Sequence, residues 1–579
     1  MKKIILLGQL CALMSTSFAQ LSFENTAISR GIDFTCGTTY NGNGVSFYDF
    51  DGDGWDDISF ASEDGSELAF YKNIDGLGFV PINLNLRDSA NNLINYQSKQ
   101  INWVDFDNDG DKDLFVTSND TGNKLFRNNG NLIFEDITSS AGFPSTDLNT
   151  YGASWGDYNN DGFLDVFISN RDPIVSSVTP NYLYKNNGDG TFTDVSVEAG
   201  IDRSKHASFC SAWIDINNDG WQDLYISNDK RNFDHNKNLM YKNNGDGTFT
   251  DISASSNTDI LIDAMTVTVG DYNRDGYFDI YVTNAGECVL LKNNGDETFT
   301  DVAESTGTDW LSFSWGAIWL DGENDMDLDL FVSSTDNVMP MSTVYYENDG
   351  NGSFTAPGGI GFDSDEGYSH SNAIGDINND GLVDFVVTNT EDQNIYLWEN
   401  KSTTTNNWLK VKLQGTLSNK DGIGSVIEIS VNGEKQYHYT NCGEGYLSQN
   451  SSSEFFGIGT NTVIDYIKVT WLSGIVDVIN NVSANQLITV VEGNNALNLN
   501  DKEILKVELS PNPAASSIKI KSPVQISKLS IYNVLNQNIL NQSPRGQSFD
   551  INIENLKSGL YLIILESNEG LTTKKFIKK

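Results

Sequence analysis

The chain has 579 residues, enough for several domains of about 100–200 residues each. Its 79 acidic and 36 basic residues give a formal charge of −43, which excludes phosphate backbones and anionic lipid surfaces as favoured partners. The 38% of hydrophobic and 11% of aromatic residues argue against disorder, because they are enough to build cores.

Residues 1–19 have the pattern of a secretory signal peptide: a basic start, a short apolar run and a small-residue end, with cleavage expected after Ala19. No later run reaches the roughly 18 apolar residues that a membrane span needs. The remaining cysteines are far apart and lack Cys-x-x-Cys spacing, so we expect no zinc or redox site. Two disulfides or four buried free thiols are both compatible with Cys36, Cys210, Cys288 and Cys442.

A nine-residue acidic segment recurs seven times along the next part of the chain, beginning with DFDGDGWDD at 49–57 and ending with DINNDGLVD at 376–384. The copies are 50–58 residues apart, a spacing that indicates a repeated supersecondary unit. An apolar run precedes each copy, a β-rich run follows it, and strand-turn-strand signals such as LYKNNGDGTFTDV (183–195) come next. About four strands per unit without helical periodicity predict the blades of a β-propeller, here a seven-bladed one over residues 20–402.

The seventh unit lacks the hairpin that ends the other units. The missing piece resembles a segment at the mature N-terminus, where LSFENTAISRGI (21–32) matches GTFTDVSVEAGI (190–201). We therefore expect the N-terminal strand to complete the last blade, which removes open sheet edges.

The acidic segments follow the pattern D-x-[DN]-x-D-G-x-x-D. Side chains at positions one, three, five and nine can converge on one point together with the backbone carbonyl of position seven, and Gly at position six permits the sharp turn. A set of oxygen ligands, several of them anionic, is typical of calcium. A single such loop is also compatible with a polar turn, but seven in register favour one structural Ca²⁺ per loop, about six or seven in all.

The expected ligands are Asp49, Asp51, Asp53, Trp55 and Asp57 in the first copy, Asp105, Asp107, Asp109, Asp111 and Asp113 in the second, Asp157, Asn159, Asp161, Phe163 and Asp165 in the third, Asp215, Asn217, Asp219, Trp221 and Asp223 in the fourth, Asp271, Asn273, Asp275, Tyr277 and Asp279 in the fifth, Asp321, Glu323, Asp325, Asp327 and Asp329 in the sixth, and Asp376, Asn378, Asp380, Leu382 and Asp384 in the seventh.

Two residues depart from this scheme. Asp56 is a surplus acid in the first copy, which we expect to be solvated. In the sixth copy Met326 replaces the turn glycine, and a side chain there strains a left-handed backbone by about 1–2 kcal/mol. We therefore expect the sixth site to be the weakest or empty.

The repeat resembles the FG-GAP/VCBS family over residues 21–402, and that resemblance implies a calcium-loop propeller that mainly binds ligands and rarely catalyses. Residues 403–495 are expected to form a small all-β domain. It resembles the ASPIC/UnbV domain through SNKDGIGSVIEI, GYLSQNSSSEFFGIG and VTWLSG, although Leu472 stands at the usual proline and the usual histidine before the phenylalanine is absent. A propeller followed by this domain is the architecture of the cartilage acidic protein 1 family, which offers no established chemistry to transfer.

The last segment has a different charge, with eleven basic and seven acidic residues in 501–579. After a linker at 496–505, residues 506–579 resemble a type IX secretion sorting domain through LSPNP, IYN and LKSGLY. The resemblance implies contact with that secretion machinery and export to the surface or surroundings of a Gram-negative cell. A third binding domain of immunoglobulin-like build is the alternative, and a β-sandwich is expected either way.

The sequence contains no nucleophile elbow, zinc-binding helix motif or phosphate-binding loop. His206 and His370 precede inner strands near the expected central mouth, where they are either site residues or ordinary turn histidines. Rings at Trp55, Trp221, Tyr277, Trp310 and Trp315 are candidates for stacking on sugars or for packing between blades.

Two functions fit these observations. The first is a secreted or cell-surface, non-enzymatic binding or adhesion module for carbohydrate or protein ligands, a role that overlaps with that of a rigid spacer. The alternative is a calcium-dependent polysaccharide-degrading hydrolase or lyase, with an acid and a base drawn from loops that the sequence does not place together.

Overall fold

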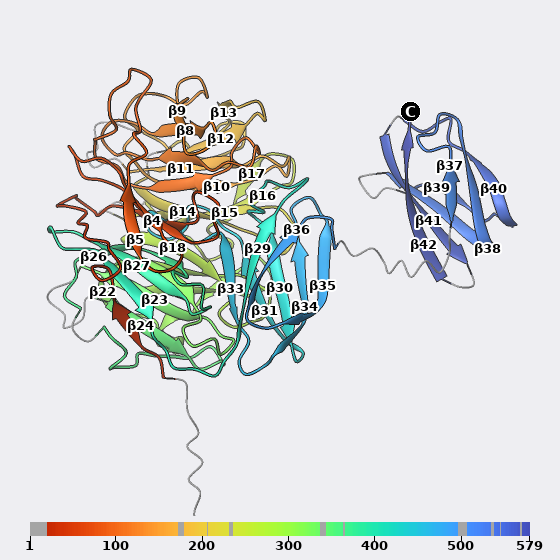
Figure 1. The fold of residues 1–579 in the computed structure, drawn as a ribbon. Helices are drawn as coiled ribbons and strands as arrows, with labels where there is room; N and C mark the ends of the chain where they lie inside the picture. The colour runs from red at the N-terminus through yellow and green to blue at the C-terminus, as the bar shows by residue number, and fades with distance from the viewer. Residues whose placement is uncertain are drawn as a thin grey trace, which may run out of the picture. The chain divides into compact units, whose positions relative to one another are not determined.

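The computed structural model describes residues 20–495, apart from 172–178, 205, 231–235, 336–342 and 363–364, and residues 507–579, apart from 534–537, 545, 558 and 568–569. The predicted signal peptide and the predicted linker lie outside the described residues. The described chain is all-β except for one short helix, α1 (Ala303–Thr306), and it divides after Asn495 into two compact units (Figure 1).

Among the described residues of the first unit, seven antiparallel groups of four strands carry the aspartate loops. In each group the loop joins the first strand to the second, as between β2 (Val45–Tyr48) and β3 (Asp57–Phe60). The first group continues with β4 (Ala69–Asn73) and β5 (Phe79–Ile82). Apolar residues on both faces of the first two strands are buried, so each group packs against its neighbours on both sides.

The other strands of these groups are β6 (Ile101–Val104), β7 (Asp113–Val116), β8 (Lys124–Asn128), β9 (Phe134–Asp136), β10 (Thr150–Gly156), β11 (Asp165–Asn170), β12 (Tyr182–Asn186), β13 (Phe192–Asp194), β14 (Ser208–Ile214), β15 (Asp223–Asn228), β16 (Leu239–Asn243), β17 (Phe249–Asp251), β18 (Ala264–Gly270), β19 (Asp279–Glu287), β20 (Val289–Asn293), β21 (Phe299–Asp301), β22 (Leu311–Leu320), β23 (Asp329–Ser334), β24 (Thr343–Asn348), β25 (Phe354–Thr355), β26 (Ser369–Gly375), β27 (Asp384–Asn389), β28 (Tyr396–Asn400) and β1 (Phe23–Asn25).

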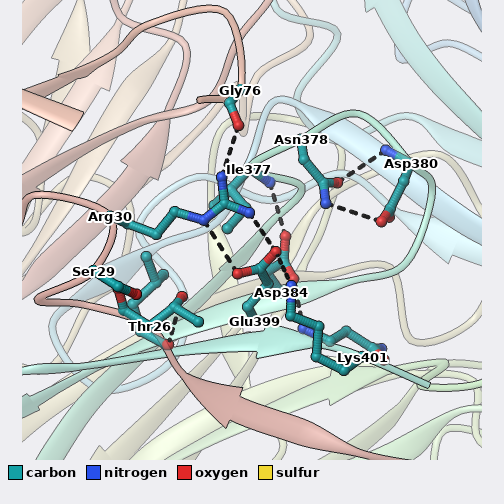
Figure 2. Close-up of polar contacts among 12 residues, drawn as sticks. Thr26, Ser29, Arg30, Gly76, Ile377, Asn378, Asp380, Asp384, Glu399 and Lys401 are labelled. Atoms are coloured by element: carbon teal, nitrogen blue, oxygen red, sulfur yellow. Dashed lines mark hydrogen bonds and ion pairs between the residues drawn. The ribbon is translucent and has the colours of Figure 1, made fainter. Parts of the chain in front are cut away.

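The N-terminal strand completes the last group, as the sequence predicts. β1 pairs antiparallel with β28, with Phe23 opposite Asn400, and the strand order is β1-β28-β27-β26. Figure 2 shows the polar contacts that hold this junction. Arg30 forms an ion pair with Glu399 of β28 and donates to the carbonyl oxygen of Gly76 at 2.8 Å, so it links the last group to the first.

Replacement of Arg30 by methionine will destabilise the protein by about 2 kcal/mol, because it removes charge-assisted hydrogen bonds to a carboxylate whose side chain is 2% exposed. Urea unfolding measures the loss. Arg127→Met is the matched control, since its ion pair with Glu135 is exposed on both sides and will cost less than about 0.5 kcal/mol. Equal losses in the two variants would show that Arg30 does not fasten the junction.

Residues 408–491 form a smaller pair of sheets within the same compact unit. One sheet has the order β33-β29-β36 and the other β31-β30-β34-β35, and their core contains Leu409, Ile427 and Trp471. The strands are β29 (Trp408–Gln414), β30 (Val426–Val431), β31 (Glu434–Tyr439), β33 (Ser453–Gly457), β34 (Val463–Thr470), β35 (Val476–Ser483) and β36 (Gln486–Val491). β32 (Ser448–Gln449) lies in the same part of the chain but belongs to the sheet of β2.

Residues 442–451, which we call the plug, leave these sheets and lie among the first strands of the seven groups. β32, inside the plug, pairs in parallel with β2, with Ser448 opposite Val45. The carbonyl oxygen of Cys442 accepts a hydrogen bond from Trp155 N–H of β10 at 2.9 Å. The plug therefore extends the first sheet by pairing with β2, and it also contacts β10, which belongs to the third group of strands.

Further plug contacts reach the remaining first strands. Gln449 bonds through its amide to the backbone of Trp103 in β6, and Gly445 N–H donates to Val267 O in β18 at 3.1 Å. Ser451 N–H donates to Ile374 O in β26 at 3.0 Å. The fully buried Tyr446 ring lies 5.6 Å from Phe209 of β14 and 5.0 Å from Trp315 of β22, measured between centroids. All seven first strands thus meet the plug.

The second unit forms one hydrogen-bonded set of strands around an aliphatic core that includes Ile518, Leu529 and Ile563. The order is β37-β38-β41-β42, with β39 and β40 also paired to the long β38. These strands are β37 (Glu508–Ser510), β38 (Ser517–Asn533), β39 (Asn538–Gln542), β40 (Gly546–Asn552), β41 (Gly559–Ser567) and β42 (Gly570–Lys578).

The structure shows the oxidation state of the four cysteines among the described residues. Cys36, Cys210, Cys288 and Cys442 are buried free thiols, and burial raises their pKa values. Of the two alternatives that the sequence leaves open, the free thiols are present.

Candidate metal centres

The first aspartate of each loop is held by backbone N–H groups of the turn that follows. Asp49 accepts from Asp53 N–H at 3.0 Å and from Gly54 N–H at 3.1 Å. The same pair of bonds forms at Asp157, Asp215, Asp271, Asp321 and Asp376, while the described bonds of Asp105 include the one from Gly110 at 3.0 Å. The turn thus fixes the first carboxylate before any ion binds.

Side chains at other predicted ligand positions bond to the same turn, and in three loops acids lie close to this carboxylate. In the third loop Asn159 Oδ1 accepts from Asp161 N–H at 3.0 Å, and Asp161 Oδ1 accepts from Phe163 N–H at 3.2 Å. One oxygen from each of three acids lies within 4.8 Å of the others in the first, second and sixth loops: Asp49, Asp51 and Asp53; Asp105, Asp107 and Asp113; Asp321, Glu323 and Asp329.

The last aspartate of each loop is buried beneath the turn. Burial first, and then the charge of neighbouring carboxylates, raises the pKa of Asp57 and of Asp113 to about 9. The same causes raise the pKa values of Asp165, Asp223, Asp279 and Asp384 well above the ordinary range. A group of acids buried this way needs a cation or protons to offset its repulsion.

Several of these buried oxygens have no protein partner among the described residues. They are Asp105 Oδ1, Asp165 Oδ2, Asp279 Oδ2, Glu323 Oε2 and Asp327 Oδ1. An unpartnered buried oxygen costs free energy unless an ion or water meets it. Oxygen ligands of this number and charge fit calcium.

The sixth loop combines two opposing effects. Met326 has φ 89°, close to the 91° of Gly54 in the first loop, so the predicted backbone strain is present. However, Asp321, Glu323 and Asp329 are all buried, and burial followed by the charge of Asp329 raises the pKa of Glu323 to about 11. The low affinity expected for this loop remains a prediction, because the concentrated charge favours a cation there.

The position-four residues join neighbouring loops, and sequence reasoning missed this role. The side-chain amide of Asn108 donates to the carbonyl oxygen of Gly162 in the next loop at 2.8 Å. Asn160, Asn218, Asn324 and Asn379 make the equivalent bond at 2.9–3.2 Å, and Arg274 makes it to Met326 at 3.3 Å. Position four is asparagine in five of seven copies, which was the available signal. These asparagines have φ of 53–60°, a conformation they tolerate well.

Two sequence expectations need correction. Asp56 is not a solvated surplus acid: its carboxylate accepts from Ser451 Oγ at 2.8 Å and from Asp376 N–H at 3.2 Å, and burial raises its pKa to about 6. His370 does not line an open mouth, because the plug occupies the centre. Its ring is buried 4.6 Å from Trp315, and burial lowers its pKa to about 3.

The remaining candidates have local roles. His206 Nε2 contacts Asp202 Oδ2 at 3.2 Å and Ser204 Oγ at 3.0 Å, as expected of a turn histidine. At loop position seven, Trp55, Phe163, Trp221 and Tyr277 lie against the hairpin glycines Gly76, Gly188, Gly245 and Gly295 of their own groups. Trp315 is buried in a cluster with Tyr446, and Trp310 packs against another core cluster.

The smaller sheets approach the aspartate loops with lysines. Lys410 Nζ lies 2.9 Å from Asp376 Oδ2 with both side chains buried, and Lys412 Nζ lies 3.5 Å from Asp49 Oδ2. Lys112, in the second loop, forms an ion pair with Asp421. The contacts of Lys410 and Lys412 offset part of the acidic charge of the seventh and first loops, whereas Asp421 adds a carboxylate beside the second loop.

A second polar cluster lies beside the plug. His438 Nδ1 is 3.0 Å from Glu454 Oε2, and Asn450 donates to Glu444 Oε1 at 2.7 Å. The cavity that these residues line has a volume of about 70 Å³. Such a volume admits waters but is too small for a sugar ring.

Glu444 makes stability depend on pH. Burial, followed by the charge of Glu454, raises its pKa to about 8, so the folded state holds a proton that the unfolded state loses near its ordinary pKa of 4.5. Its contribution is present at pH 4 and is lost as the pH rises to about 8. Glu444→Gln will therefore match the wild type near pH 5 and exceed it by about 1–2 kcal/mol at pH 8, after allowance for partial exposure. Urea unfolding with saturating calcium at both pH values measures this, and parallel curves would contradict it.

Comparison with family models divides the chain into three parts, two of which lie almost wholly within the first compact unit. The FG-GAP-like repeat model matches residues 105–168, 170–226, 215–282, 271–332 and 321–387. The ASPIC and UnbV model matches 415–497, and the secretion system C-terminal sorting domain model matches 508–579. The chain carries FG-GAP-like repeats, an ASPIC/UnbV domain and a C-terminal sorting domain.

The sorting domain indicates type IX secretion to the outer surface or the extracellular space. Among the described residues, no helix is long and apolar enough to cross a membrane.

Curated relatives include cartilage acidic protein 1. The Xenopus tropicalis protein is 22% identical over 456 residues, covering 75% of this chain and 62% of the relative. The human protein is 26% identical over 266 residues, covering 42% of this chain and 38% of the relative. The chain thus spans less than two thirds of the length of these relatives.

Solved structures with some similarity come from diverse proteins. An Agrocybe aegerita lectin that recognises non-reducing terminal N-acetylglucosamine has a TM-score of 0.35 and 19% identity, covering 54% of this chain and 80% of the lectin. A rhamnogalacturonan lyase from Bacillus licheniformis has a TM-score of 0.31 and 12% identity, covering 82% of this chain and 91% of the lyase. TM-scores this low carry no argument about function.

Proposed function

We propose that the exported chain is a non-enzymatic binding or adhesion module for carbohydrate or protein ligands, built on a closed seven-bladed propeller stiffened by calcium. The observation that carries this proposal is the repeated loop, whose first carboxylate is held in place by its own turn in copy after copy. Such loops make a rigid scaffold, and rigid scaffolds present binding surfaces at low entropic cost.

Calcium is the ion that this donor set favours. The carboxylate and amide oxygens converge, and several buried oxygens still need a partner. Residues at positions one, three, five and nine would hold the ion with the carbonyl of position seven. The ion supplies positive charge that offsets the repulsion between buried acids.

A closed ring is supported by contacts from three directions. β1 pairs with β28, Asn379 of the seventh loop donates to Gly54 O of the first loop at 3.2 Å, and the plug meets all seven first strands. An open row of groups would leave the first and last groups unpaired.

Glycan and matrix-protein arrays probed with the secreted chain in millimolar calcium test the binding role. We expect retention of at least one class of ligand, and loss of that retention in EDTA. Blank arrays in calcium would overturn the proposal, and release of reducing ends or unsaturated sugars from a polysaccharide panel would replace it with the enzymatic alternative.

A further inference from the structure

One junction between neighbouring loops lacks the side chain that bridges the others. Gly52 stands at position four of the first loop, where the other copies have asparagine or arginine, so no side chain reaches Gly110 of the second loop. A Cβ atom at Gly52, Gly54 or Gly110 would meet nothing within 4 Å. At the next junction, by contrast, a Cβ at Gly162 would lie 2.5 Å from a carbonyl oxygen. The first junction is therefore open where that one is covered.

A cleft of about 710 Å³ lies at this open junction. Asp49 and Asp51 of the first loop and Asp105 and Asp111 of the second loop line one side of it. Lys412 and Gln414 of β29 and Thr489 of β36 line the other side. Its volume falls within the roughly 300–1,000 Å³ of small-ligand sites.

The cleft has ammonium groups with donors to spare. Lys412 Nζ lies 3.5 Å from Asp49 Oδ2 and its side chain is 34% exposed, so one weak contact engages an ammonium that has three donors. Lys420 also lines the cleft and is held by its backbone N–H, which donates to Asn108 Oδ1 at 3.0 Å. A calcium ion in the first loop would pair with the Asp49 carboxylate, so Lys412 would be more available to bind an anion.

The rest of the lining suits hydroxyl groups. Carboxylate acceptors such as Asp111 alternate with amides such as Gln414 and Asn131, and a hydroxyl both donates and accepts. The ring of Phe50 is 1% exposed, so it offers no stacking platform.

We propose that this cleft binds a uronate-bearing oligosaccharide, with its carboxylate on Lys412 and Lys420 and its hydroxyl groups on the side chains of Asp111, Gln414 and Asn131. The inference rests on the proposed binding function and places one ligand class at one junction of the propeller.

Calorimetry with trigalacturonate and the full mature chain in calcium tests the site. We expect saturable binding by the wild type, and affinity at least tenfold lower for the methyl-esterified trisaccharide and for Lys420→Gln.

Gly52→Asn will lower affinity at least tenfold, because its amide supplies the missing bridge to Gly110 and closes the junction. Asn160→Gly, which removes a bridge at a different junction, is the matched control and will keep wild-type affinity. Calcium binding by all variants is measured in parallel, and unchanged calcium stoichiometry assigns the losses to the cleft.

Two outcomes would overturn the inference. If trigalacturonate does not bind while the arrays retain other ligands, the cleft is not a uronate site, and the proposed binding function is unaffected. Equal affinity in the wild type, Gly52→Asn and Lys420→Gln would place the uronate site elsewhere. Blank arrays, by contrast, would overturn the binding function itself.

Discussion

Removal of calcium will lower the melting temperature of the mature chain by more than about 15 °C. Each occupied loop stabilises the folded state by about 2.7 kcal/mol when free calcium is about a hundredfold above its dissociation constant. The loss is large because Asp57 and Asp113 would each face the other carboxylates of their own loop without the charge of the ion. Calorimetric titration, with thermal melting in calcium and in EDTA, measures both quantities, and we expect about six or seven ions per chain.

A single-loop variant ties this effect to the loops. Asp157→Asn removes charge from the first position of the third loop and will lower the stoichiometry by one ion. Asp189→Asn changes an exposed hairpin acid and will leave the stoichiometry unchanged. An identical melt in calcium and EDTA would sink the metal assignment, and the acidic loops would then be candidates for a cationic partner.

Removal of one buried side chain from the plug will cause the second large loss of stability. Tyr446→Ala will destabilise the protein by about 3–5 kcal/mol, because it leaves a cavity among Tyr151, Phe209 and Trp315 that the surrounding strands cannot fill. Urea unfolding gives the change in free energy, and near-ultraviolet circular dichroism reports whether the aromatic cluster loses its order.

The control for the plug is an exposed apolar residue of the same small sheets. Val463 is 48% exposed, so Val463→Ala will cost less than about 0.5 kcal/mol. A matching small loss in Tyr446→Ala would show that the Tyr446 ring does not hold the plug among the first strands.

The sequence by itself determined the repeat and the strand-rich units. These features are local: the aspartate spacing, the Asn-Gly and Asp-Gly turns and the alternating apolar residues act within about 50 residues of one another. The pairing of the N-terminal strand was also predictable, since residues 21–32 carry the pattern of the missing hairpin strand.

Only the tertiary structure decided which groups meet across long separations. No local pattern indicates that the plug lies among the first strands of the groups, because Tyr446 and Gln449 contact strands that are far apart in the repeat region. The same holds for Asp56, whose partners Ser451 and Asp376 lie more than three hundred residues away. The open junction at Gly52 could also be identified only from the structure, because it is defined by the side-chain bridges at the other junctions. The physical reason is that burial and pairing depend on how the groups pack against one another, whereas the sequence specifies each group separately.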